Sequence, residues 1–403
     1  MSKSTVQRSD LAAAAKALAD ILHITPLTKS AALSSLYGRN IYFKWENKFR
    51  TGSFKERGAV NFLSHLSKQQ RTKGVCAASA GNHALALSYH ASNMKVPCHI
   101  FMPVTAPLVK VQTTKSFGAN VMLQGDTFHQ ACEHAMQFAK KKGLLFVSPF
   151  NHPWIVAGQS TCGTEMLEQC PQMDSLIAPV GGGGLLAGSA MAIKLKRPEV
   201  FTLGVQSEWA AQKKWQTPAD IAIRPHSIAD GIAVKELGEV TAPLIERYVD
   251  CMTTVSENEI ARAMVQCLEV ERAVIEGAAA AALAALPKDL LPDRCQHTVV
   301  IISGSNVDMN VLSRLLERDM GDKGRLLKVA VSVPDRPGTL FTTAGVLAKS
   351  GANVLQVLHD RSFSKIPGNV DITFQLEVRD VLHREEVLRE LKVKGFLVRV
   401  LEE

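Results

Sequence analysis

Short apolar runs alternate with amphipathic stretches from about residue 40 to residue 310. The runs have the length and composition of buried strands, and they cover residues 41–45, 74–78, 98–102, 120–123, 145–147, 176–180, 201–205 and 298–303. The stretches between them have helical spacing, as at 128–142 and 259–286. Such alternation predicts an α/β fold whose parallel sheets are covered by helices on both faces.

The pattern changes near residues 314–326, which are rich in charge, contain Gly321 and Gly324, and suit a linker. Beyond them, strands are predicted at 327–333, 353–360, 370–378 and 396–401, and helices at 340–350 and 382–394. The resulting order, βαββαβ, is typical of a small ferredoxin-like module. We therefore predict one domain over residues 1–320 and a second over 321–403.

Composition indicates a globular chain, since 46% of the 403 residues are apolar and 21% are charged. No uncharged apolar run reaches the ~18 residues that a membrane-spanning helix needs, and residues 11–22 predict a helix capped by Asp10 rather than a leader. The eight cysteines have neither Cys-x-x-Cys nor zinc-ligand spacing. We expect buried free thiols, a cytoplasmic location, no membrane partner and no metal site.

The net charge of +8 is spread along the chain, because residues 325–403 carry only +2 of it. A solvated basic surface explains this distribution better than a nucleic-acid-binding arm does, so we expect no nucleic-acid partner. A bound phosphate and a substrate carboxylate would account for part of the excess.

Two features carry candidate chemistry. Lys55 lies among small residues in the motif TGSFK at 51–55, and four consecutive glycines at 181–184 follow an apolar strand. A desolvated lysine loses its proton more readily and can attack an aldehyde, while the backbone N–H groups of a glycine loop at a helix start can bind a phosphate. Together they predict an aldehyde cofactor with a phosphate group. Taken alone, Lys55 could be a surface lysine, and the four glycines could form a turn that binds no ligand.

Four markers resemble those of the fold-type II pyridoxal-phosphate enzymes, and they occur in the order TGSFKERGA (51–59), SAGNHA (79–84), GGGG (181–184) and SGSN (303–306). The motifs AGQ (157–159), ADGIAVK (229–235) and EGA (276–278) narrow the resemblance to the threonine ammonia-lyases, or threonine dehydratases, with a single ACT domain. This implies pyridoxal 5'-phosphate as cofactor and two open, twisted, mostly parallel sheets like those of the tryptophan synthase β subunit. It also implies a large subdomain at 1–73 and 148–320, a small subdomain at 74–147, and a homodimer or homotetramer.

The resemblance also implies residue roles. Lys55 would hold the cofactor and act as the catalytic base. The other residues that would contact the cofactor are Phe54, Asn82, Gly181, Gly182, Gly183, Gly184, Gly231 and Ser303. The substrate would be bound by Ser79, Ala80, Asn82 and His83, and an effector of the ACT domain by Gly338 and Asn353. Turn and helix-capping duty is the alternative for Ser79 and Asn82, and we give His83 no role in proton transfer.

Some positions depart from the family pattern. Ala80 replaces the serine that acts as acid or base in the related serine racemases, and alanine cannot transfer a proton, which favours elimination over racemisation. Gln212 and Lys214 follow Glu208 where some relatives hold a divalent cation, and an ammonium group cannot be a ligand. Glu276 could face the site or the solvent.

The expected reaction is the α,β-elimination of L-threonine to 2-oxobutanoate and ammonia, with L-serine giving pyruvate as a secondary activity. Serine racemase, a serine or diamino-acid lyase, and an amino-acid-binding regulator without turnover are the alternatives. The presence of Lys55 and the four glycines argues against the last. The tail would bind isoleucine or valine in isoleucine biosynthesis, bind a nucleotide in a catabolic enzyme, or only pair subunits, and the sequence leaves these open.

Overall fold

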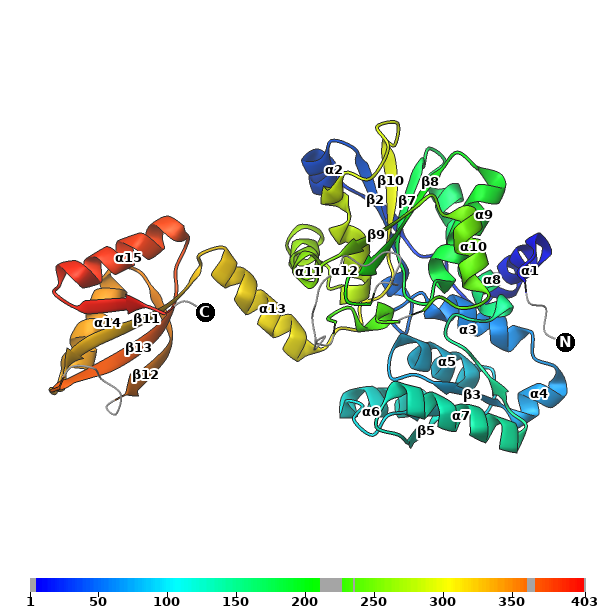
Figure 1. Cartoon of the computed structure of the whole chain (residues 1–403), viewed down its shortest axis with the longest axis horizontal. Coiled ribbons are helices and arrows are strands. Elements are labelled where there is room, and N and C mark those ends of the chain that lie inside the picture. Colours follow the sequence, from blue (N-terminus) through cyan, green and yellow to red (C-terminus); the bar gives the residue numbers. More distant parts are fainter. Residues whose placement is uncertain (1–4, 211–226, 235, 361–366, 402–403) are drawn as a thin grey trace. The chain divides into compact units, whose positions relative to one another are not determined.

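The computed structural model describes residues 5–210, 227–234, 236–360 and 367–401. The chain divides into two compact units, Met1–Val307 and Asp308–Glu403, and each is described by itself (Figure 1). In the described residues, no helix is long and apolar enough to cross a membrane.

A six-stranded sheet forms the centre of the first unit. In spatial order its strands are β1 (Leu27–Ser30), β2 (Asn40–Trp45), β10 (His297–Ile302), β7 (Ser175–Pro179), β8 (Phe201–Ser207) and β9 (Cys251–Val255). β1 is antiparallel to β2, and all the other pairs are parallel. β10 comes last in the sequence but lies between β2 and β7, where Val300 is opposite both Phe43 and Ile177.

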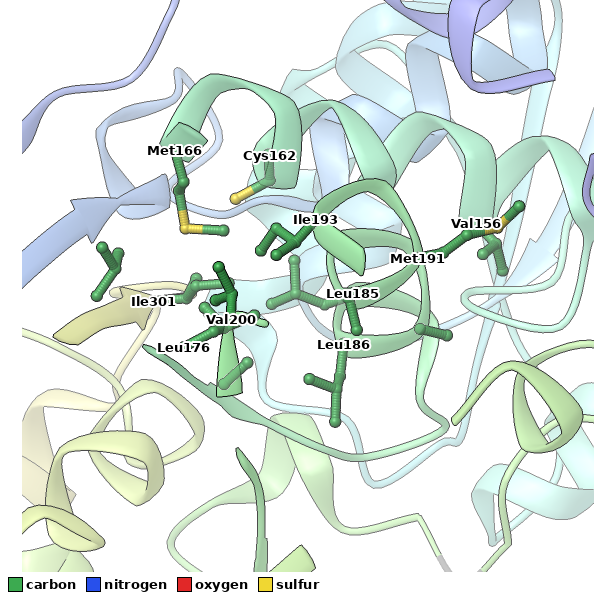
Figure 2. Close-up of a cluster of buried hydrophobic side chains, with 14 of the residues drawn as sticks. Val156, Cys162, Met166, Leu176, Leu185, Leu186, Met191, Ile193, Val200 and Ile301 are labelled. Atoms are coloured by element: carbon green, nitrogen blue, oxygen red, sulfur yellow. The ribbon is translucent and has the colours of Figure 1, made fainter. Parts of the chain in front are cut away.

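Helices cover both faces of this sheet (Figure 1). On one face lie α8 (Pro153–Gln169), α9 (Gly184–Lys196) and α10 (Thr241–Tyr248), and on the other lie α11 (Glu257–Glu271) and α12 (Gly277–Ala284). Figure 2 shows the first interface, where Leu176 and Ile301 of the sheet meet Cys162 of α8 and Ile193 of α9. Burial of these apolar side chains stabilises the layers by about 1.5–3 kcal/mol for each large side chain.

In the sequence, the strands of a smaller sheet come between β2 and β7 of the large sheet. Its parallel strands, in spatial order, are β5 (Asn120–Leu123), β4 (Cys98–Met102), β3 (Val75–Ala78) and β6 (Leu145–Phe146). Helices α5 (Asn82–Asn93), α6 (Leu108–Ser116) and α7 (Phe128–Lys142) pack with it. Before it come α1 (Arg8–Ala19), α2 (Ala31–Tyr37), α3 (Lys55–Ser64) and α4 (Lys68–Lys73). Two mostly parallel sheets are what the sequence analysis expected.

The second unit contains the predicted ferredoxin-like module. After α13 (Met309–Asp322) come β11 (Leu326–Pro334), α14 (Thr339–Lys349), β12 (Asn353–Asp360), β13 (Asn369–Glu377), α15 (Val381–Val393) and β14 (Leu397–Val400). The strands form an antiparallel sheet in the order β12-β13-β11-β14. Val331, Phe374 and Leu391 belong to its core. The βαββαβ order is therefore confirmed.

Three local expectations differ from the structure. The helix predicted over 259–286 is two helices, because α11 ends at Glu271, its capping residue Arg272 has a left-handed φ of 56°, and α12 begins only at Gly277. Asp10 does not cap α1; Gln7 does, and the Asp10 carboxylate accepts the Gln7 backbone N–H at 2.8 Å. The stretch expected to be a linker largely forms α13, which also spans the predicted domain boundary at residue 320.

A buried ionic network anchors α3. The Arg57 guanidinium is 1% exposed, donates to Glu46 at 2.6 and 2.8 Å, and donates to Glu165 at 2.6 and 2.7 Å. The amine of Lys44, which is fully buried, donates to Glu165 at 2.6 Å. Burial raises the pKa of Glu46, but Arg57, together with Lys44 and Thr25, outweighs this effect and the net shift is downward. The network fixes a helix whose first residue is Lys55.

Candidate active site

The predicted site residues gather at one edge of the two sheets. The loops that follow strands β2, β3, β7 and β10 carry Lys55, Asn82, the glycines at 181–184 and Ser303, respectively. Within the large sheet the carboxyl ends of the parallel strands point the same way, so their loops lie at one edge, which is where ligands bind in open α/β sheets. Hydrogen bonds from Asn82 to Glu276 and from Asn306 to Asn82 hold the β3 loop at this edge. All four loops belong to the first unit.

Lys55 is the first residue of α3, and its amine points into this site. The Nζ donates to the carbonyl oxygen of Pro149 at 2.9 Å and lies 4.9 Å from the centre of the Phe54 ring. The Phe54 backbone N–H donates to the Ser303 carbonyl at 3.0 Å, which joins the lysine loop to the end of β10. Desolvation lowers the pKa of Lys55 to about 8, although Glu276 raises it. The amine is therefore far easier to deprotonate than an exposed lysine.

The glycine loop, residues 181–184, leads directly into the thirteen-residue helix α9. Gly183 has a φ of 89°, and a Cβ at this position would lie 2.7 Å from Ile245. A Cβ on Gly182 would lie 2.3 Å from atoms of the Phe150 ring. Backbone conformation and packing therefore require glycine here. The first N–H groups of a helix such as α9 have no partner within the helix and are able to bind an anion.

Asn82, at the start of α5, is held by two side chains. Its Nδ2 donates to the two carboxylate oxygens of Glu276 at 2.8 and 3.0 Å, and its Oδ1 accepts from Asn306 Nδ2 at 2.6 Å. Asn306 also donates from Nδ2 to the Thr51 carbonyl at 2.9 Å and from its backbone to Glu276 at 3.2 Å. These bonds fix which end of the Asn82 amide faces each neighbour. They also settle the orientation of Glu276, which is 3% exposed and points inward.

Glu276 makes the stability of the protein depend on pH. Burial raises its pKa to about 7 from 4.5, against the lowering effect of Asn82. Because the folded pKa lies above the unfolded one, the wild type loses stability as the pH rises through this interval. The Glu276→Gln variant lacks this titrating group and should not show the loss. The difference in free energy of unfolding, variant minus wild type, should therefore rise by about 2–3 kcal/mol when the pH is raised from about 5 to about 8. Urea unfolding at both pH values measures the change, and parallel pH curves would contradict it.

The residues expected around the substrate are present at the start of α5, but some side chains have internal partners. Ser79 Oγ accepts the Gly81 backbone N–H at 3.2 Å, so this hydroxyl has the turn role considered from the sequence. His83 is 3% exposed and donates from Nε2 to the Val147 carbonyl at 3.0 Å. Burial, and to a smaller extent Lys55, lowers the pKa of His83 to about 3, so the ring is neutral. Ala80 lies partly buried beside them.

The remaining cofactor candidates lie beside these loops. Ser303 follows β10 and is 1% exposed. Gly231 is exposed, and a Cβ on it would lie 3.1 Å from Ala278 Cβ. Its neighbour Asp230 accepts from Lys110 of α6 at 3.0 Å, an ion pair between the loop and the small subdomain.

The other sequence predictions concern regions away from this site. Gln212 and Lys214, on which the doubt about a cation rested, lie outside the described residues. Among the residues that are described, no group of three or more His, Cys, Asp or Glu side chains could hold a metal ion. In the second unit, Gly338 precedes α14 with a φ of 90°, and the exposed Asn353 donates to Glu377 at 3.4 Å.

Sequence reasoning missed three residues of this site. Pro149 and Phe150, which contact the amine and the glycine loop, were not singled out, and Asn306 was quoted without a role. A signal existed, since Pro149 and Phe150 follow a predicted strand of the parallel sheet and must lie at the same edge as the other loops.

Comparison with known proteins agrees with this geometry. Residues 18–304 match the family of pyridoxal-phosphate dependent enzymes, and residues 328–396 match the ACT domain. The chain is 41% identical to the L-threonine ammonia-lyase of Thermotoga maritima over 97% of its own length and 98% of that protein. Its fold is similar to that of threonine deaminase isoform 2 from Solanum lycopersicum (TM-score 0.70, 31% identity, 78% of this chain and 94% of that one). It is also similar to maize serine racemase (TM-score 0.70, 28% identity, 79% of this chain and 98% of that one).

Proposed function

Since the chain belongs to the L-threonine ammonia-lyase family of pyridoxal-phosphate-dependent enzymes, we propose that it converts L-threonine to 2-oxobutanoate and ammonia, with L-serine as a secondary substrate giving pyruvate. The observation that carries this proposal is the desolvated amine of Lys55, which donates to the carbonyl of Pro149, next to the Phe150 ring that packs on the glycine loop. The eight cysteines are free thiols, which fits a reducing cytoplasm.

The residues present fit pyridoxal phosphate. Lys55 would bind its aldehyde carbon, the glycine loop its phosphate, Asn82 its ring oxygen and Ser303 its ring nitrogen, with Phe54 and Gly231 beside it. The packing of the glycine loop supports this fit, because a side chain at Gly182 would collide with Phe150 and one at Gly183 would collide with Ile245. When bound, the cofactor withdraws the electron pair left by removal of the substrate α-proton.

In this reaction, different residues of the chain would bind the substrate and transfer its proton. The N-terminus of α5, with Ser79 and Asn82, binds the substrate carboxylate through backbone N–H groups. Lys55, freed by the substrate, takes the α-proton, after which the β-hydroxyl leaves. His83 is neutral and bonded to Val147, so it takes no proton in this scheme.

A product assay tests the proposal. The purified full-length chain, incubated with L-threonine and pyridoxal phosphate, should release 2-oxobutanoate and ammonia in equal amounts, and L-serine should give pyruvate at a lower kcat/KM. Release of neither keto acid from either amino acid would refute it.

Serine racemase is the second candidate, because a serine racemase is among the similar structures. Ala80 argues against it, since a methyl group cannot carry a proton to the second face of the substrate. We expect no D-serine from the wild type with L-serine, and detectable D-serine from Ala80→Ser by chiral chromatography. Formation of D-serine at the rate of pyruvate formation by the wild type would favour the racemase instead.

The ACT domain, we further propose, binds an effector at Gly338 and Asn353 and contributes to a homodimer or homotetramer. The exposed Asn353 amide and the turn at Gly338 offer hydrogen-bonding groups that suit an amino acid. Calorimetry of the full chain with isoleucine, valine and nucleotides should give a heat of binding with one of them, weakened about 10-fold in Asn353→Ala. If none of them binds, the domain serves assembly alone.

A further inference from the structure

The segment 147–151 passes the Lys55 amine and is fixed at both of its ends. At one end, the Val147 backbone N–H donates to the Cys76 carbonyl of β3 at 2.8 Å, and the Val147 carbonyl accepts from His83 at 3.0 Å. At the other end, Asn151 Oδ1 accepts the Val240 backbone N–H at 2.9 Å. The carbonyl of Pro149 therefore lies on a stretch of chain with few ways to move.

Through Phe150, this segment packs against the glycine loop. Its ring atoms would lie 2.3–2.4 Å from a Cβ on Gly182, and its Cα and Cβ would lie 3.2–3.3 Å from one on Gly184. Such distances mean that the ring covers the bare α-carbon of Gly182. The packing of Phe150 thus sets where the preceding carbonyl, that of Pro149, stands relative to Lys55.

The contacts of the Lys55 amine suit an ammonium group better than a neutral amine. The Pro149 oxygen accepts from Nζ at 2.9 Å, and the Phe54 ring lies 4.9 Å away. A carbonyl oxygen and an aromatic face both attract a positive charge. Glu276 is the carboxylate that acts on this amine, and its effect also favours the charged form.

We propose that the Pro149 carbonyl and the Phe54 ring form a seat for Lys55 after it has taken the substrate α-proton, and that Phe150 positions this seat. In that step the substrate C–H bond breaks and an N–H bond forms on Lys55, while the electron pair of the C–H bond remains on the substrate carbon, from which the bound cofactor would withdraw it. The seat stabilises the product side of the proton transfer. This inference rests on the proposed function, because it needs a substrate with an acidic α-hydrogen.

The contacts of this seat also explain how Lys55 can act as a base and then remain protonated in a buried site. With the carbonyl and the ring in place, desolvation still lowers the pKa of the amine to about 8, so it is easy to deprotonate. The same two contacts lower the free energy of the protonated form, and they do so without a water molecule. A base that accepts a proton in a dry site needs such partners, since an unpaired buried charge is costly.

Phe150→Leu tests the positioning role in the loaded enzyme. The kcat for L-threonine should fall about 10- to 100-fold while KM stays within about 2-fold, because a small displacement at the reacting centre mainly affects the chemical step. The ratio of kcat with ordinary threonine to kcat with α-deuterated threonine should increase, since proton transfer becomes slower. Phe128→Leu, a change of the same kind at a side chain 54% exposed on α7, should alter none of these values.

A second measurement does not depend on turnover. In the full chain freed of cofactor, the pKa of Lys55 can be obtained from the pH dependence of its labelling by an amine reagent, read by mass spectrometry. Loss of the seat should lower this pKa by about half a unit or more in both variants, since Phe150→Leu displaces the Pro149 carbonyl and Phe54→Leu removes the aromatic ring.

The outcomes separate the two claims. A wild type that does not act on threonine would refute the proposed function, while the labelling experiment would still test the seat. An unchanged isotope ratio in Phe150→Leu, or a Lys55 pKa that stays constant or rises in both variants, would overturn the seat.

Discussion

Lys55→Ala is expected to abolish turnover of L-threonine, with kcat/KM lower by on the order of 10³-fold or more. One side chain supplies both the covalent attachment of the cofactor and the base for the α-proton, and general-base catalysis alone contributes about 10²–10⁴-fold. The yellow colour of the bound cofactor and the borohydride-dependent labelling of residue 55 should disappear together. Absorbance spectra, peptide mass spectrometry and the product assay measure the three effects.

Lys115→Ala provides the matched control for this experiment. Lys115 is exposed on α6, so its loss should change neither colour nor rate. The fold of Lys55→Ala should also persist, because the network that anchors α3 belongs to Arg57 and not to Lys55. A folded Lys55→Ala protein that keeps near-normal turnover would exclude the lysine-based mechanism.

Arg57→Met should have the largest effect on stability, a loss of about 3–5 kcal/mol. The variant keeps most of the side-chain volume but leaves the Glu46 carboxylate, which is fully buried, without its cationic partner. Such a carboxylate takes up a proton, so the pKa of Glu46, lowered in the wild type, rises in the variant. The deficit should therefore shrink as the pH falls, first through the raised pKa of Glu46 in the variant and then through its lowered pKa in the wild type, because protonation removes the cost of the unpaired carboxylate and then the contribution of the ion pair.

Chemical unfolding of the full chain at several pH values measures this deficit. Arg39→Met is the control, because Arg39 pairs at 3.4 Å with Asp289, whose side chain is 85% exposed. A single long ion pair whose carboxylate lies in solvent contributes about 0–1 kcal/mol. Equal losses in the two variants would mean that the buried network adds nothing beyond a surface ion pair.

The fold was largely predictable because its strands are short, apolar and separated by helical stretches. β4 and β5 have the predicted bounds, and so does α7. Thr127 caps the start of α7, and Gly143, which has a left-handed conformation, follows its last residue. β1 and β9 were missed, since each carries polar residues that do not form an apolar run. The break between α11 and α12 was also missed, because no proline marks it and the capping residue of α11 is an arginine with positive φ.

The site was predictable in its motifs but not in its connections. The sequence identified Asn82 and Lys55, yet the bond from Asn306 to Asn82 joins residues 224 positions apart, and no spacing rule predicts it. Glu276 has ordinary alanine-rich neighbours, so only the structure shows that it faces inward. Backbone acceptors such as the Pro149 carbonyl leave no trace in residue identity at all.

The position of β10 has a consequence for synthesis of the chain. Its residues 297–302 fill the gap between β2 and β7, so a ribosome must translate nearly the whole first unit before that sheet can close. Until then the inner edges of β2 and β7 expose unpaired backbone groups, which invite mispairing with other chains. Nascent chains halted before His297 should therefore be sensitive to protease and prone to capture by chaperones, and those released a short distance beyond Ile302 should not.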